Sequence, residues 1–202
     1  MTREQPRSFR LPARATLADR EGSTIVEFAF VMPIFMLVII GCLDVGQMVY
    51  GIGVLDGAVE KAARDSTLET GDTSIADGKV RDVIGEVLPG AIVSSTRESY
   101  YAFSDVGRPE RWNDANNDGN CSTGETYVDE NGNGSWDSEI GESGNGGAND
   151  VVVYKVTVRY DPVFAIPLVP LNWNTREISS TTVHRNQPFA LQEGRGSASG
   201  TC

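Results

Sequence analysis

The feature that most constrains the fold is an uninterrupted apolar run near the N-terminus. From Ile25 to Leu43 there are 19 residues, and Glu27 is the only charged one among them. A helix needs roughly 20 apolar residues to cross the hydrocarbon core of a bilayer, which is ~30 Å thick. Pro33 does not argue against such a helix, because membrane helices tolerate proline. The run therefore predicts a transmembrane helix.

The distribution of charge predicts how this helix is oriented. Residues 1–22 contain five Arg and three acidic residues, whereas the chain after the apolar run is acidic. The positive-inside bias places the N-terminus in the cytoplasm and the bulk of the chain outside it. We therefore expect a cytoplasmic leader over 1–22, a transmembrane helix over 23–50 and an exported domain over 51–202. The net charge of −11 argues against nucleic acid as a partner.

Glu27 needs an explanation, because a charge inside a membrane segment tends to be functional and to have a partner. Gly22 is the fifth residue before it. Cleavage after Gly22 would make Ser23 the first residue and would create an amine that is largely cationic near neutral pH. That amine would lie one helical turn from Glu27. One hypothesis is that the two groups pair, within a chain or between neighbours, and set the register of packed helices; the other is an uncleaved anchor with Glu27 at the interface.

The exported part reads as helices followed by strands. Residues 53–66 continue the first helix with one apolar face, and residues 79–90 form a second helix. Short strands are expected at 91–96 and 98–105, and longer ones at 151–160, where residues alternate in polarity, and at 176–185. The predicted fold class is α+β, with the long helix packed on a small antiparallel sheet. Residues 190–202 read as a flexible tail.

An acidic insertion rich in Asn and Gly, residues 110–147, interrupts this pattern. The stretch "DANNDGNCSTGE" (Asp114–Glu125) matches the calcium-loop pattern D-x-[DN]-x-[DN]-G-x5-E at each specified position. Oxygen atoms at alternate positions point inward in such a loop, glycine allows the sharp turn, and the last acid binds with both oxygens. The predicted calcium ligands are Asp114, Asn116, Asp118, Asn120 and Glu125.

A second, weaker copy begins at Asp129. Its predicted ligands are Asp129, Asn131, Asn133 and Asp137. Position twelve is Ile140, so the bidentate acid is missing there, and Glu139 or Glu142 could replace it only if the loop bends. We expect structural calcium in one or both loops; the alternative is a disordered acidic loop without metal.

The cysteines leave two interpretations open. Cys42 lies inside the apolar run and reads as a small hydrophobic residue. Cys121 and Cys202 form a disulfide if this part of the chain is outside the cytoplasm, or they remain two free thiols.

No enzymatic motif is found, and the single histidine, His184, falls on a predicted strand. We therefore expect no catalytic activity. Three hypotheses follow: a membrane-anchored protein cleaved after Gly22, an uncleaved single-pass anchor carrying a calcium-stabilised binding or adhesion domain, and a membrane-anchored hydrolase, which is the weakest of the three.

The start of the chain also resembles a known family. "GSTIVEF" is similar to the processing site of type IV prepilins, and the longer stretch from Gly22 to Arg64 resembles the TadE-like family of tight-adherence pilus assembly pseudopilins. The likeness returns over residues 152–189. The resemblance implies that a prepilin peptidase cuts between Gly22 and Ser23, and that Glu27 and Phe28 serve processing and assembly. It further implies a bacterial inner-membrane protein with a periplasmic domain, whose partners are other pilins and the inner-membrane assembly machinery of the pilus.

Overall fold

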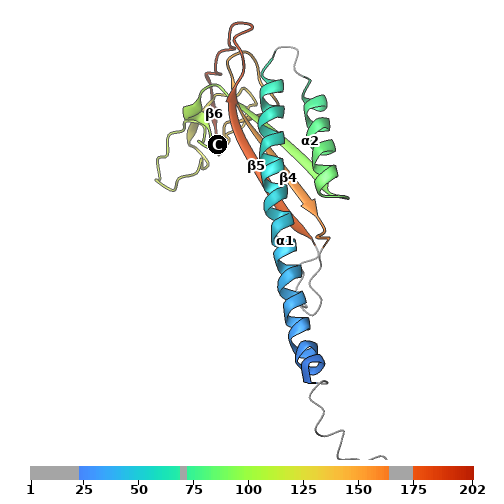
Figure 1. The fold of residues 1–202 in the computed structure, drawn as a ribbon. Helices are drawn as coiled ribbons and strands as arrows, with labels where there is room; N and C mark the ends of the chain where they lie inside the picture. The colour runs from blue at the N-terminus through green and yellow to red at the C-terminus, as the bar shows by residue number, and fades with distance from the viewer. Residues whose placement is uncertain (1–22, 69–71, 164–174) are drawn as a thin grey trace, which may run out of the picture.

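The structure is a computed structural model that describes residues 23–68, 72–163 and 175–202 (Figure 1). Its longest element is helix α1, Ser23–Ser66, which is continuous through Pro33. The apolar run and the amphipathic segment predicted after it are therefore one helix. The first half of α1 stands clear of the other elements in Figure 1, and the second half lies against the sheet.

The second helix, α2, spans Thr73–Val87 and packs beside the second half of α1. It begins at the capping residue Asp72, whose side chain accepts hydrogen bonds from the backbone N–H groups of Ser74 (2.8 Å) and Ile75 (3.3 Å). The sequence predicted this helix only from residue 79. The helix starts earlier because an aspartate at this position satisfies amide groups that a helix end leaves unpaired.

A four-stranded antiparallel sheet lies behind the two helices, in the order β3-β1-β4-β5. The strands are β1, Ile92–Tyr100; β3, Glu142–Ser143; β4, Val151–Tyr160; and β5, Arg176–Arg185. β1 is a single strand where two short ones were expected, and residues 103–105 form a short 3-10 helix. β4 and β5 pair along their whole length, from Val151 with Arg185 to Tyr160 with Arg176. Most of the connection between β4 and β5 lies outside the described residues.

The core lies between the helices and the sheet. Leu55 and Val59 of α1 and Val80 and Ile84 of α2 are buried at helical spacing. They meet the alternate residues of β4, which are Tyr154, Val156, Val158 and Tyr160. The predicted alternation of β4 is thus confirmed, and with it the α+β class of a long apolar helix on an antiparallel sheet.

The acidic insertion and the C-terminal residues form a second, smaller unit at the far end of the sheet from the apolar part of α1 (Figure 1). Strand β2, Thr126–Asp129, pairs antiparallel with β6, Ala198–Thr201. Cys121 and Cys202 are joined by a disulfide. The expectation of a flexible tail over 190–202 is therefore wrong for its last residues, because strand pairing and a covalent bond hold them to the insertion.

Candidate functional site: the apolar helix and two acidic loops

The first half of α1 is an exposed apolar surface. Ile25, Phe28, Phe30, Val31 and Ile34 are each at least 60% exposed. Within the described residues, one helix is long and apolar enough to cross a membrane, and it is this one. The finding is compatible with a single-pass membrane anchor.

Two of the predicted processing and assembly residues lie on the exposed surface of this helix. Glu27 and Phe28 are in its first turns, and Ser23 is its first residue. Gly22 and the leader over residues 1–22 lie outside the described residues. Cys42 is a free, exposed cysteine further along the same apolar surface.

The end of the apolar segment is tied to the sheet by a buried ion pair. Arg176, the first residue of β5, donates to the Asp44 carboxylate on α1. A hydrogen bond to the Met48 sulfur (3.9 Å) is a second contact of the same guanidinium group. The pair holds α1 against the sheet where the apolar run ends.

The first acidic loop is closed by hydrogen bonds from its own backbone to its side chains. The Asp114 carboxylate accepts from the N–H groups of Asp118 (3.1 Å) and Gly119 (3.0 Å). The Asn116 side-chain oxygen accepts from Asp118 N–H (2.9 Å), and the Asp118 carboxylate accepts from Asn120 N–H (2.8 Å). Each predicted ligand of the first half of this loop therefore takes part in one turn, with its oxygen atoms held by the backbone.

Glu125 closes the far side of the first loop. Its Oε1 accepts from the N–H groups of Ala115 (2.8 Å) and Asn116 (3.3 Å), and its Oε2 accepts from Ser122 N–H (2.9 Å). These three donors stand at positions two, three and nine of the loop. The residue at position twelve thus bridges the beginning and the end of the loop.

The second loop repeats this arrangement. The Asp129 carboxylate accepts from the N–H groups of Asn133 (3.1 Å) and Gly134 (2.9 Å), which stand at positions five and six, as do the two amides bound to Asp114. Asn131 accepts from Asn133 N–H (3.2 Å), and Asp137 accepts from the side-chain nitrogens of both asparagines. All four predicted ligands of the second copy are therefore brought together.

The backbone conformations of the two loops agree as well. Positions four and six adopt positive φ in both, at Asn117 (57°) and Gly119 (78°) in the first loop and at Gly132 (78°) and Gly134 (81°) in the second. Glycine adopts this conformation without steric penalty. The first six positions of the two loops therefore share one backbone conformation.

Sequence reasoning missed Glu110, an acid from outside the second loop that binds its backbone. Its Oε1 accepts from the N–H groups of Glu130 (2.6 Å) and Asn131 (3.4 Å), and its Oε2 accepts from Asp137 N–H (3.2 Å). Ile140, at position twelve, is a buried apolar side chain. Glu139 instead accepts a hydrogen bond from the Tyr100 hydroxyl, and Glu142 lies exposed on β3. The vacancy at position twelve was the only signal in the sequence that a distant acid was needed.

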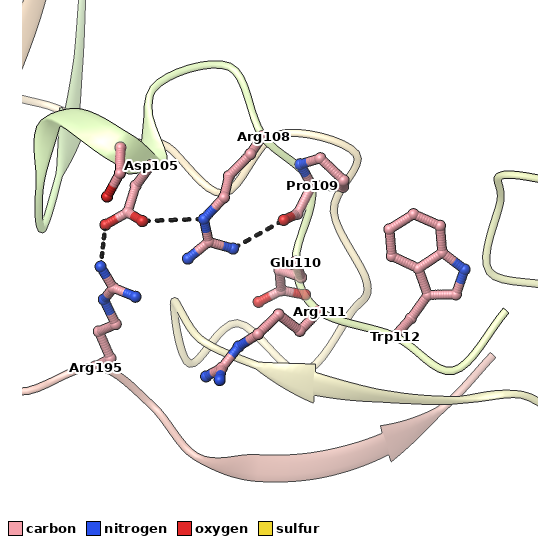
Figure 2. A pocket seen from close by; sticks show the side chains of 8 residues that line it. Asp105, Arg108, Pro109, Glu110, Arg111, Trp112 and Arg195 are labelled. Atoms are coloured by element: carbon pink, nitrogen blue, oxygen red, sulfur yellow. Dashed lines mark hydrogen bonds and ion pairs between the residues drawn. The ribbon is translucent and has the colours of Figure 1, made fainter.

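Buried acids and partly exposed arginines form a charge network beside Glu110, at a pocket of about 580 Å³ (Figure 2). Arg108 donates to Asp105 (2.9 Å) and to Glu130 (2.8 Å), and Arg195 from the C-terminal segment also pairs with Asp105. Hydrogen bonds from Arg108 lower the pKa of Glu130 to about 2. Since the acids and bases pair with one another, the network fastens the insertion to the C-terminal segment.

The donor chemistry of the loops fits calcium, a hard cation that takes carboxylate, amide and backbone oxygens. Each loop supplies aspartate and asparagine oxygens on alternate residues. In the first loop Glu125 adds a carboxylate with both oxygens turned inward, and Glu110, from outside the second loop, does so there. Within the described part of the chain, no three His, Cys, Asp or Glu side chains form a group that could hold a metal. The first candidate set includes three acids, Asp114, Asp118 and Glu125, together with asparagine amides, and its acids are not gathered into such a group in this structure.

Comparison with known proteins bears on the helix alone. Residues 22–64 match the family model of the TadE-like protein. The resemblance seen in the sequence is thereby confirmed for this segment. Searches of curated proteins and of solved structures give no significant match. The TadE-like segment coincides with α1, so the match includes Gly22, Glu27 and the helix face that enters the core, whereas α2, the sheet and the acidic loops lie beyond it.

Proposed function

We propose that the protein is a pseudopilin, a minor pilin-like component in the assembly of a tight-adherence type IV pilus. The observation that carries this proposal is the TadE-like match over residues 22–64, on a helix with one apolar exposed half and one half packed in a folded domain. The TadE-like family implies association with the membrane and with pilus assembly machinery. The role proposed here is non-catalytic.

In this proposal the helix is held in the bacterial inner membrane, with its N-terminus in the cytoplasm and the α+β domain in the periplasm. A prepilin peptidase removes residues 1–22, and Ser23 becomes the mature N-terminus. The new amine and Glu27 are one helical turn apart and have opposite charges. Their pairing, within a subunit or between subunits, aligns α1 with the helices of other pilins or pseudopilins. The exported domain presents a surface to neighbouring minor pilins or to the surface that the pilus contacts.

Calcium has a structural role in the same proposal. An insertion with this many carboxylates buries little apolar surface, and bound cations would offset the repulsion between its acids. Asp114, Asn116, Asp118, Asn120 and Glu125 would hold one ion, and Asp129, Asn131, Asn133 and Asp137 a second. The ions would keep the insertion rigid outside the cytoplasm.

The deciding experiment is mass spectrometry and N-terminal sequencing of the full chain, extracted from membranes of cells with and without a prepilin peptidase. We expect the chain to begin at Ser23 only when the peptidase is present. A chain that keeps residues 1–22 in both cases would overturn the proposed processing and leave an ordinary membrane anchor.

A second experiment tests the assembly role of Glu27. The variant Glu27→Gln should be cleaved but should impair pilus assembly, whereas Glu86→Gln, which changes an exposed residue of α2, should leave assembly normal. Normal pili in the Glu27 variant would remove the role assigned to this carboxylate.

A further inference from the structure

The second acidic loop has no acid at position twelve, yet three of its backbone amides donate to a carboxylate from elsewhere in the chain. We propose that Glu110, which precedes both loops in the chain, supplies the bidentate carboxylate of the second calcium site. This inference rests on the proposed binding of calcium and assigns a ligand that the loop's own twelve residues do not contain.

The first argument is a correspondence of hydrogen bonds. In the first loop, Glu125 accepts from the amides of positions two and three through one oxygen and of position nine through the other. Glu110 accepts from positions two and three of the second loop through one oxygen and from position nine through the other. Glu110 therefore stands to the second loop as Glu125 stands to the first.

The second argument is that the backbone holds Glu110 in this place. Its N–H donates to the Asp137 carbonyl oxygen (3.0 Å), and its carbonyl oxygen accepts from Trp136 Nε1 (3.4 Å). Two residues away, the Arg108 carbonyl oxygen accepts from Ile140 N–H (3.1 Å). The segment that carries Glu110 thus runs along the end of the second loop, where position twelve would otherwise deliver its side chain.

The third argument concerns charge. Glu110 is 0% exposed, and Asp129 is 6% exposed. Among the described residues, no basic side chain forms an ion pair with Glu110, Asp129 or Asp137, because the nearby Arg108 and Arg195 pair with Asp105 and Glu130. A buried carboxylate is costly unless its charge is compensated. Backbone amides orient the Glu110 carboxylate, and a cation in the loop would neutralise it.

The loops are therefore interleaved along the chain. Glu110, which takes the place of position twelve in the second site, comes first in the chain and is followed by the whole first loop. Strand β2 comes next, and its last residue, Asp129, begins the second loop. The disulfide and β6 close the same unit from the C-terminus. Binding at the second site would thus fasten the start of the insertion to its end.

The test is calcium stoichiometry and affinity of the full chain in detergent, by native mass spectrometry and calorimetry. The wild type should bind two ions. Glu110→Gln should lose one of them, or bind it more than about tenfold more weakly, and Glu125→Gln should lose the other. Glu139→Gln, a matched change of a nearby acid, should keep both.

Combined variants identify the site that is lost. Glu110→Gln added to Asp129→Asn should lose no more than either change alone, whereas Glu110→Gln added to Asp114→Asn should abolish both ions. If the glutamine side chain of Glu110→Gln destabilises the loop, Glu110→Asp provides a second variant, because it keeps the negative charge but moves the carboxylate back by one methylene. Glu110→Asp should weaken binding at the second site, as Glu125→Asp should weaken binding at the first. The far-UV circular dichroism spectrum, together with a chain mass that shows the Cys121–Cys202 disulfide formed, reports whether each variant is folded.

The outcomes distinguish the assignment of Glu110 as a ligand from the proposal that the loops bind calcium. Two ions bound with unchanged affinity by Glu110→Gln and Glu110→Asp would overturn the assignment of Glu110 and leave calcium binding in place. A wild-type chain that binds no calcium at millimolar concentration would overturn both the proposed calcium binding and the assignment of Glu110.

Discussion

Asp44 of α1 and Arg176 of β5 form a buried ion pair although 132 positions separate them in the chain. The Asp44 side chain is 3% exposed and the Arg176 side chain 18%. The pair stands where the apolar part of α1 gives way to the part packed on the sheet. It therefore ties α1 to the sheet at the end of the apolar run.

The first prediction concerns this pair. Asp44→Ala should destabilise the α+β domain by roughly 3–5 kcal/mol, because it leaves the Arg176 guanidinium largely buried without its carboxylate partner. Asp56→Ala, at an exposed position on the same helix, is the matched control and should change stability by less than about 0.5 kcal/mol. Urea unfolding of the full chain in detergent measures both. Equal midpoints for the two variants would contradict the structural importance of the pair.

The second prediction concerns pH. Burial raises the pKa of Asp77, but hydrogen bonds from Arg97, Tyr154 and Ser95 outweigh it and lower the pKa from 3.8 to about 2. A carboxyl whose pKa is lower in the folded state stabilises the fold above its unfolded pKa, and this contribution is lost as the pH falls through the folded pKa. Stability should therefore fall by about 2 kcal/mol between pH 4 and pH 2 on account of Asp77.

Urea midpoints between pH 2 and pH 5 measure this effect. Asp77→Asn should lower stability at pH 5 and flatten the decline toward pH 2. Asp82→Asn, at an exposed position on the same helix, should keep the wild-type slope. A wild-type slope in the Asp77 variant would contradict the prediction.

The third prediction concerns the disulfide. Its two cysteines are 81 residues apart, so the bond restricts a long loop of the unfolded chain. Cys202→Ser should cost about 3–4 kcal/mol. Hydrogen exchange should accelerate in β6 and β2 and change little in β4 and β5. Cys42→Ser is the control, since Cys42 is free. Equal hydrogen-exchange rates of β6 in the two variants would contradict the prediction and show that strand pairing alone holds the C-terminus.

The fourth prediction concerns Gly200, which faces Tyr127 across the β2–β6 pair. A Cβ atom at this position would lie 2.3 Å from Tyr127 Cζ, so the ring lies where a side chain would be. Gly200→Ala should destabilise the second unit by about 1–3 kcal/mol. Gly194→Ala, where a Cβ meets no atom within 4 Å, is the matched control. Thermal melts followed by tyrosine and tryptophan fluorescence compare the two, and identical melts would contradict the close contact.

The fifth prediction concerns calcium removal. With a dissociation constant of ~10⁻⁴ M, an ion at 1 mM stabilises the folded state by about 1.4 kcal/mol per site. Chelation should therefore lower the melting temperature of the full chain. Asp118→Ala should remove the share due to the first loop, whereas Asp82→Ala should respond as the wild type does. A melting curve that is the same with calcium and with chelator would contradict the metal sites.

Some of the candidate site was predictable because its signals are local. The spacing Asp114–Asn116–Asp118–Gly119 acts through hydrogen bonds between residues two to five positions apart, and these form in the structure. Glu110 was not predictable in the same way. It acts across 20 to 27 positions, and no periodicity relates it to the amides that it binds.

The sequence alone determined the elements whose information is local: the apolar helix from its unbroken run, β4 from its alternation and the first loop from its spacing. Only the tertiary structure decided what depends on contacts between distant residues. β6 forms from a segment with no apolar alternation because β2 and the disulfide hold it, and Arg176 finds its partner on a helix 132 positions away. Such contacts form only when the whole chain is folded, since closing each loop must be offset by interactions made elsewhere in the structure.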